Sequence, residues 1–142
     1  MILGLGNDLV DIRRIEQLLK KFPLRFQNSV FTAEERTYAL RCQPAAPAFA
    51  RRFSAKEACA KALGVGLKIL GTKTPDGIRW QEVEVLSSAT GQPFLHLTGN
   101  ALARLQAMTP AHMTPVVHIS LSDQYPYALA TVILAATAVE GG

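Results

Sequence analysis

The sequence predicts an α+β fold in which a small, mainly antiparallel sheet packs against helices. Three observations support this prediction. Apolar or alternating segments at the start, in the middle and near the end of the chain have the pattern of strands. Between residues 11 and 63, apolar side chains recur instead with the period of a helix. Turn residues then join neighbouring strand segments, as in hairpins.

Length and composition indicate one globular domain. The chain has 142 residues, of which 49% are hydrophobic and 18% are charged. Such a chain can bury a core and is not expected to be disordered. We assign residues 1–136 to a single domain and expect residues 137–142 to form a loose C-terminal tail.

Charge is unevenly distributed along the chain. Residues 1–73 carry 13 Lys and Arg against 6 Asp and Glu, a net charge of +7. Residues 74–142 carry 2 against 5, a net charge of −3. A basic N-terminal half favours an acidic partner, which could be nucleic acid, a phosphate-rich small molecule or an acidic protein.

The cysteines and the apolar segments indicate the compartment. Cys42 and Cys59 lie far apart and lack metal-ligand spacing, so we expect free thiols in a reducing environment. No basic segment precedes an N-terminal apolar run, and no apolar run has the length of a membrane span. We therefore expect a cytoplasmic protein that does not contact a membrane.

The first ten residues have the pattern of a buried strand that ends in a carboxylate. Alternation places Gly4, Gly6 and Asp8 on one face, together with Ile2 and Val10. The two glycines leave space for another element or a ligand to approach the backbone near Asp8. Alternatively, Asp8 only ends the strand.

Residues 11–26 have the pattern of an amphipathic helix, with Asp11 as its N-cap and Pro23 as a stop signal. Basic side chains lie mostly off the apolar stripe, and Glu16 alone offers an acidic balance. These basic side chains form either a solvated helix face or a docking face for an acidic partner. They are Arg13, Arg14, Lys20, Lys21 and Arg25.

Two further helices are predicted before residue 64. Thr32 and Glu35 form a capping box for a helix that ends near residue 41. The next helix, at 48–63 or starting near Pro47, places Glu57 and Lys61 on one face. Alternatively, Glu57 belongs to a capping box that begins at Ser54, and its pair with Lys61 is an ordinary surface pair.

The rest of the chain alternates between strands and turns. Gly64 follows the helix as a stop signal, and we assign 69–77 to a loop. We expect strands at 78–86, 94–97, 116–121 and 127–135, a turn at 122–126, and a helix at 100–108 with Leu102 and Leu105 facing inward. In the strand predicted at 116–121 and the residue after it, alternation puts three polar side chains on one face: His118, Ser120 and Ser122. This face is either a solvent-facing edge or a binding face.

Two separated segments together resemble a known family. They are Gly6-Asn7-Asp8 and, roughly forty to fifty residues later, Phe53-Ser54-Ala55-Lys56-Glu57-Ala58-Cys59-Ala60-Lys61. This pattern is similar to that of the 4′-phosphopantetheinyl transferases, and closest to the small bacterial type, the holo-acyl-carrier-protein synthases. Further segments in the same order add to the resemblance: Phe31-Thr32, Arg52-Phe53, Gly64-Val65-Gly66, Gly91-Gln92-Pro93 and His118-Ile119-Ser120-Leu121-Ser122.

The resemblance implies a single-lobed fold and a specific reaction. The phosphopantetheine arm of coenzyme A would move to a serine of apo-acyl carrier protein, in support of fatty acid biosynthesis, and adenosine 3′,5′-bisphosphate would be released. Mg²⁺, held by Asp8 and Glu57, suits the charge that develops on the pyrophosphate. Lys61 would contact the pyrophosphate or protonate the leaving phosphate. The base would be Glu57 or a metal-bound water.

The resemblance also implies binding residues for coenzyme A. Arg52 is expected at the 3′-phosphate, with Arg51 as a weaker candidate, whereas Lys56 would either face coenzyme A or serve as a structural cation. The full set expected near coenzyme A is Arg52, Lys56, Lys61, Gly64, His118, Ser120 and Ser122. Two positions depart from the family pattern, because Asn7 replaces a small or aliphatic residue and Asp123 replaces a frequent histidine.

Partners and assembly follow from the same resemblance. The basic side chains of residues 13–25 would dock the acidic carrier protein, and the active sites would lie between the subunits of a homotrimer. Two alternatives remain at this level. One is a metal-dependent hydrolase of a nucleotide pyrophosphate, which could use the same carboxylates. The other is a basic nucleic-acid-binding module, which the scarcity of aromatic residues on a basic surface disfavours.

Overall fold

A computed structural model describes residues 1–67 and 77–139 of the chain. The elements are, in order, β1 (Ile2–Asp11), α1 (Ile12–Lys21), α2 (Pro23–Val30), α3 (Ala33–Arg41), α4 (Ala46–Leu63), the short 3₁₀ turn η1 (Trp80–Glu82), β2 (Val83–Ser87), β3 (Pro93–Leu97), α5 (Gly99–Met108), β4 (Met113–Gln124) and β5 (Tyr127–Ala138). Most of the loop expected at 69–77 lies outside the described residues.

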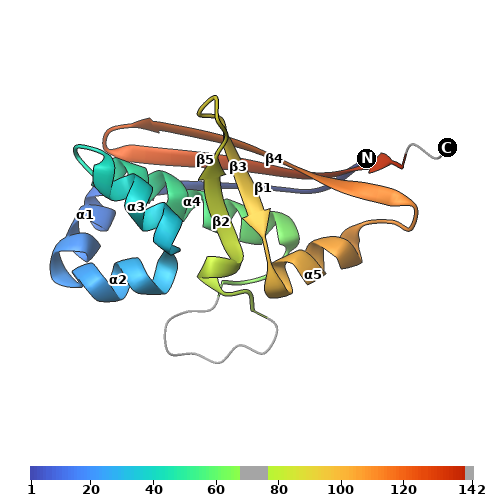
Figure 1. Cartoon of the computed structure of the whole chain (residues 1–142), viewed down its shortest axis with the longest axis horizontal. Helices are drawn as coiled ribbons and strands as arrows, with labels where there is room; N and C mark the ends of the chain where they lie inside the picture. The colour runs from blue at the N-terminus through green and yellow to red at the C-terminus, as the bar shows by residue number, and fades with distance from the viewer. Residues whose placement is uncertain (68–76, 140–142) are drawn as a thin grey trace.

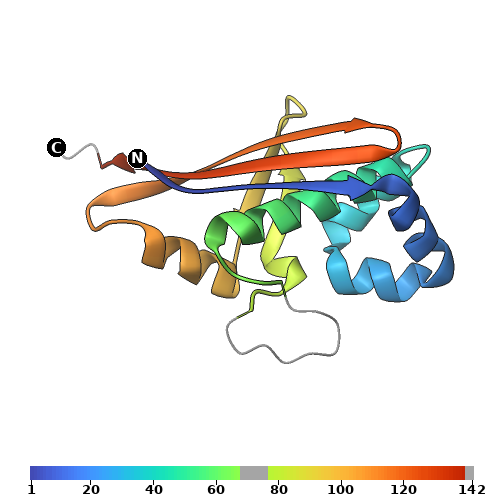
Figure 2. The same ribbon diagram turned by 180° about the vertical axis from the view of Figure 1, so that it is seen from behind.

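The strands form a long sheet and a separate hairpin. The long sheet has the order β1-β5-β4, and both pairings are antiparallel. β2 and β3 form the predicted hairpin beside it. In Figures 1 and 2, the helices lie on one side of the long sheet, with α4 directly beneath β1. The predicted α+β class with a mainly antiparallel sheet is confirmed.

The contact between β1 and α4 depends on small residues. A Cβ at Gly4 would collide with the carbonyl oxygen of Ala62, and a Cβ at Gly6 would collide with that of Ala58. The space that the glycines leave is therefore filled by the helix backbone. The alanines of α4 complete this packing, because most of the helix is buried between the sheet and the other elements.

Several predicted boundaries differ from the observed ones. The helix expected at 11–26 is divided at Phe22, because Pro23 cannot continue α1 but fits the first turn of α2. The strand expected from 78 begins only at Val83, after η1. β4 extends beyond the predicted strand at both ends, to Met113 and Gln124, and β5 extends at its C-terminal end, to Ala138. The two strands are longer than predicted because each residue of one pairs with a residue of the other.

Two further expectations were wrong in detail. Leu102 of α5 is exposed rather than buried, and Ala101 faces the core together with Leu105. Thr137 and Ala138 belong to the predicted loose tail, but they pair with β4 as the end of β5. Residues 140–142 lie outside the described residues.

The long sheet has two different faces. The face toward α4 carries Gly6 and Asp8 of β1, opposite the buried Val132 and Ala130 of β5. The outer face carries exposed apolar side chains and is left uncovered in Figures 1 and 2. Its largest members include Leu5, Leu9, Tyr127 and Leu129, which are 65%, 63%, 47% and 39% exposed.

Candidate active site

The close contact between β1 and α4 brings three predicted catalytic side chains together. The Lys61 ammonium lies 3.1 Å from Oδ1 of Asp8 and donates a hydrogen bond of 3.0 Å to the backbone oxygen of Asn7. Glu57 lies one turn before Lys61 on α4. Helix α4 begins at Ala46, so Ser54 is a buried interior residue and the capping-box alternative for Glu57 does not apply.

The pKa of the Glu57 carboxyl is shifted by burial and by three charged neighbours. Burial raises the pKa of the Glu57 carboxyl, and the negative charge of Asp8 raises this pKa further. The positive charges of Lys61 and Arg14 act in the opposite direction and lower it. Arg14 of α1, which we predicted as a docking residue, therefore interacts electrostatically with Glu57.

The two carboxylates fit a hard divalent cation whose other ligands are water and substrate. No group of three or more His, Cys, Asp or Glu side chains is placed to hold a metal within residues 1–67 and 77–139. The two carboxylates of Asp8 and Glu57 match Mg²⁺, which typically takes one or two protein carboxylates and completes its shell with water and substrate phosphates. A structural zinc site would need four ligands.

Lys56 does not reach this site. Its ammonium is fully buried, lies 2.8 Å from Oε1 of Glu35, and donates hydrogen bonds to the backbone oxygens of Trp80 and Val83. Of the two roles that the sequence left open, the structure favours the structural cation. The ammonium of Lys56 is buried and paired in this way, and its predicted contact with coenzyme A stays a prediction.

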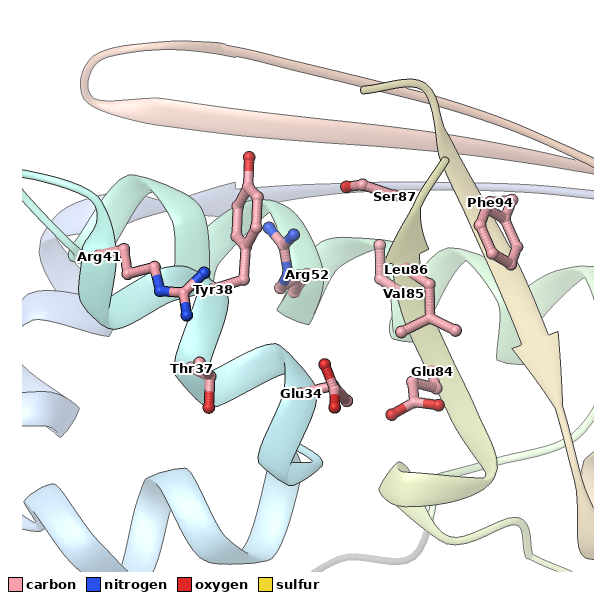
Figure 3. A pocket seen from close by; sticks show the side chains of 10 residues that line it. All are labelled: Glu34, Thr37, Tyr38, Arg41, Arg52, Glu84, Val85, Leu86, Ser87 and Phe94. Carbon is pink, nitrogen blue, oxygen red and sulfur yellow. The ribbon is translucent and has the colours of Figure 1, made fainter. Parts of the chain in front are cut away.

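Arg52 lines a second candidate site, a cavity of about 420 Å³ between α3, α4, β2 and β3. Figure 3 shows the side chain beside Tyr38, and its guanidinium carbon lies 3.9 Å from the centre of the Tyr38 ring. Arg52 is only 4% exposed, and burial lowers the pKa of its guanidinium. Its Nε is buried and finds no hydrogen-bond partner among the described residues, so an anion would be a favourable neighbour.

The remaining walls of this pocket were missed by sequence reasoning. Arg41 adds a second guanidinium, Tyr38 and Phe94 add aromatic rings, and Ser87 adds a hydroxyl. They come from three different elements, and no local motif links them. The basic balance of the N-terminal half was the only available signal, and it did not single out Arg41.

Arg51 points to a different partner. Its guanidinium donates a hydrogen bond of 2.8 Å to Oδ1 of Asp123 near the end of β4. Both side chains are partly buried. Asp123, which occupies the position of the family's frequent histidine, thus ties β4 to α4.

Three predicted ligands of coenzyme A lie on the other side of the sheet. His118, Ser120 and Ser122 pair with Ile133, Thr131 and Leu129, and these β5 residues share the outer face with Leu5 and Leu9 of β1. Asp8 faces α4 instead. The structure confirms that the three polar side chains share a face, but within one chain it does not bring them to Asp8, Glu57 and Lys61.

Gly64 ends α4 in the left-handed conformation, with φ of 69°, which favours glycine. Its N–H bonds back to the last turn of the helix. Arg104 of α5 donates a hydrogen bond of 3.0 Å to the neighbouring Leu63 oxygen. Gly64 therefore has a clear structural function as a helix cap, and its predicted contact with coenzyme A stays a prediction.

The basic residues predicted as a docking face are exposed on α1 and α2. Arg13 differs from the others because Asp11 holds it, with a 2.7 Å ion pair. Next to the basic side chains, Leu18, Phe22 and Phe26 line an apolar groove of about 210 Å³. No helix among the described residues is long and apolar enough to cross a membrane.

Comparisons with known proteins identify the relatives of this chain. The model of the 4′-phosphopantetheinyl transferase superfamily matches residues 4–130. A holo-[acyl-carrier-protein] synthase of Caulobacter vibrioides is 50% identical over 136 residues, which cover 96% of this chain and 97% of that protein. A protein of the same name from Chelativorans sp. is 44% identical over 140 residues, with 99% and 100% covered.

Solved structures give the same result. The holo-[acyl-carrier-protein] synthase of Neisseria meningitidis has a TM-score of 0.74 and 30% identity, and the match covers 95% of this chain and 99% of that one. That of Bacillus anthracis, in complex with coenzyme A (3′,5′-ADP), has a TM-score of 0.68 and 28% identity, with 94% and 96% covered.

The fold, the carboxylate site and these matches define the class of protein: it is an enzyme that transfers a phosphopantetheinyl group. The chain belongs to the 4′-phosphopantetheinyl transferase superfamily. The resemblance to the small holo-acyl-carrier-protein synthases that the sequence motifs predicted is confirmed.

Proposed function

We propose that the chain is a Mg²⁺-dependent holo-[acyl-carrier-protein] synthase of the cytoplasm that supports fatty acid biosynthesis. It transfers 4′-phosphopantetheine from coenzyme A to a serine of apo-acyl carrier protein and releases adenosine 3′,5′-bisphosphate. The observation that carries the proposal is the meeting of Asp8, Glu57 and Lys61 at the contact between β1 and α4. The names of the relatives, and the coenzyme A in the related complex, support it.

The reaction makes one bond and breaks another at phosphorus. The serine oxygen bonds to the phosphorus that carries pantetheine, and the bond from this phosphorus to the bridging oxygen breaks. The serine proton goes to a base, and the negative charge remains on adenosine bisphosphate. Such transfers are accelerated mainly by positioning and by stabilisation of charge.

The residues of the carboxylate site suit these requirements. Asp8 and Glu57 would hold Mg²⁺, which would supply positive charge beside the pyrophosphate. The Lys61 side chain is 55% exposed, so it can leave Asp8 for a substrate phosphate at small cost, since exposed ion pairs contribute about 1 kcal/mol or less. The proton of the attacking serine would go to Glu57 or to a metal-bound water.

We further propose that the active site is completed by a second copy in a homotrimer. Arg52 and Glu57 are five positions apart on α4, which separates them by about 140° around the helix axis. The pocket of Arg52 faces α3 and β2, whereas Glu57 faces β1. Coenzyme A held by both would have to bridge two chains, and the exposed apolar outer face of the long sheet offers a surface for their contact.

In this arrangement each group of predicted residues has a use. Arg52 would bind the 3′-phosphate, and the polar row on the outer face would lie near the contact with the neighbouring chain: His118, Ser120 and Ser122. The acidic carrier protein would dock on α1 and α2, where exposed basic residues adjoin the apolar groove at Phe22. These residues are Arg13, Arg14, Lys20, Lys21 and Arg25.

Two other functions make different predictions. A metal-dependent pyrophosphate hydrolase could use the same carboxylates, but it would cleave coenzyme A or a nucleotide without a protein acceptor. A nucleic-acid-binding module would show binding that weakens steeply with salt. Neither alternative explains why the chain belongs to a transferase family.

The decisive test is the intact mass of apo-acyl carrier protein after incubation with this protein, coenzyme A and Mg²⁺. We expect a gain equal to the phosphopantetheine arm, and we expect a chelator to abolish the gain. No gain with several folded carrier proteins would overturn the proposal. Cleavage of coenzyme A without transfer would instead support the hydrolase.

A further inference from the structure

The pocket around Arg52 has an acidic end that phosphate binding does not require. Glu34, in the first turn of α3, and Glu84, on β2, both line the pocket. Figure 3 shows the two carboxylates pointing toward one another, away from Arg41. Thr32, the N-cap of α3, donates its hydroxyl to Glu84 and so holds this side chain beside the first turn of the helix.

Carboxylates in this place need an explanation, because they weaken the binding of a phosphorylated ligand by repulsion. The cost is offset if they contact a part of the ligand that is uncharged and offers N–H donors. An ionised carboxylate can only accept hydrogen bonds. One oxygen of Glu84 accepts the hydrogen bond of Thr32. Within residues 1–67 and 77–139, its other oxygen and the Glu34 carboxylate have no hydrogen-bond or ion-pair partner and can accept from a ligand.

The rest of the lining indicates the chemistry of the ligand. At one side, the nearly buried Arg52 has an Nε without a hydrogen-bond partner among the described residues, so an anionic ligand group would be favourable there. At another, the Phe94 ring is 43% exposed and offers a flat apolar surface. A ligand with a phosphate, a planar ring and an amino group meets all three conditions. The cavity of about 420 Å³ is within the usual range for a small-molecule site.

We propose that Glu34 and Glu84 determine the base specificity of the pocket by accepting hydrogen bonds from the 6-amino group of adenine. The inference rests on the proposed function, because coenzyme A is the ligand that carries this base together with a 3′-phosphate. Under it, Arg52 recognises the phosphate, Phe94 packs on the purine, and the two carboxylates select a purine with an amino group.

A purely structural explanation makes a different prediction. Carboxylates in the first turn of a helix are stabilised by its dipole, and Glu34 could serve α3 alone. In that case the identity of the base would not matter, and substitution of Glu34 would affect every substrate to the same extent. The two explanations therefore differ in substrate discrimination rather than in stability.

The test compares kcat/KM for coenzyme A with that for an analogue that carries unsubstituted purine in place of adenine. A hydrogen bond to a charged group contributes about 1.5–3 kcal/mol, so the wild-type full-length protein should prefer coenzyme A by about tenfold or more. In Glu34→Ala and Glu84→Ala, this preference should fall toward one, through loss with coenzyme A and little change with the analogue. Thr37→Ala, on the same helix and lining the same pocket, should keep the wild-type preference.

Two outcomes would overturn the inference: no preference in the wild-type protein, or equal losses with both substrates in the variants. Calorimetric binding of adenosine 3′,5′-bisphosphate and of its purine counterpart makes the same comparison without catalysis. If transfer fails but this binding preference is present and depends on Glu34, the proposed function is wrong and the base specificity stands. If transfer succeeds without a preference, only the base specificity is wrong.

Discussion

The two sides of α4 carry sites that are built in different ways. Toward β1, Asp8 approaches Glu57 and Lys61 because glycines let a strand and a helix touch backbone to backbone. Toward α3 and β2, the pocket of Arg52 is assembled from four elements. Three of these elements, α3, α4 and β2, are joined by a buried pair, in which Glu35 binds the Lys56 ammonium and accepts a hydrogen bond from the Val85 N–H.

This difference separates function from stability. The carboxylates are partly accessible and sit on a contact that small residues maintain without them. The pocket depends on charged groups that are removed from water, and such groups are costly unless they stay paired. Substitutions on the first side should therefore affect activity, and substitutions beneath the second side should affect folding.

The largest effect is expected for Asp8→Ala and Glu57→Ala. Each substitution removes one of the two carboxylates that we assign to Mg²⁺, and activity should fall by at least about 100-fold. Initial rates of carrier-protein modification measure the loss, and circular dichroism with thermal unfolding checks the fold. Full activity in both variants would show that the site is assigned wrongly.

The buried pair should give the largest effect on stability. Lys56→Met or Glu35→Gln alone leaves a buried group without its partner, which costs about 3–5 kcal/mol of the free energy of unfolding. The double variant should lose less than the sum of the two single losses. Urea unfolding of the wild-type protein, the two single variants and the double variant gives the double-mutant cycle. Strictly additive losses would mean that the pair is not coupled.

Much of the carboxylate side could be predicted from the sequence, and little of the pocket could. The face of Asp8 follows from strand alternation, and the face of Glu57 from helix periodicity, so both needed only local rules. Lys56 could not be placed in this way, because its partners Glu35, Trp80 and Val83 come from distant segments. Periodicity gives the direction of a side chain but not what covers it.

The long strands show the same limit. Ser122, Asp123 and Gln124 have the composition of a turn, yet they continue β4 because β5 supplies a partner for each of them. Alternation correctly grouped His118 with Ser120, but it could not indicate that their face is opposite to that of Asp8. That relation is set by the register of three strands.

Titration of Glu57 tests whether Asp8 and Arg14 lie close enough to shift the pKa of its carboxyl. Its pKa is raised by burial and by Asp8, and lowered by Lys61 and Arg14. Asp8→Asn removes a negative neighbour and should lower this pKa, whereas Arg14→Gln removes a positive one and should raise it. Carbon-detected NMR of the metal-free protein follows the Glu57 carboxyl directly. Unchanged values in both variants would mean that these groups do not share a site.

The smallest effect is expected at the ion pair between Arg51 and Asp123. Both side chains are partly exposed, at 23% and 34%, and such pairs contribute about 1 kcal/mol or less. Asp123→Asn should therefore lower the free energy of unfolding only slightly and leave carrier-protein modification close to the wild-type rate. A large loss of activity with an intact fold would place Asp123 in the active site, despite its departure from the family's histidine.

The central claim is that each chain carries two half-sites and that a working site takes one half from each of two chains. The most direct test mixes two variants that are each impaired, Asp8→Ala and Arg52→Met, under conditions that let subunits exchange. We predict that activity with limiting coenzyme A rises above that of either variant alone, because some contacts join an intact carboxylate site to an intact pocket. No recovery, with mixed oligomers verified by mass spectrometry, would contradict the claim and place both halves of the site within one chain.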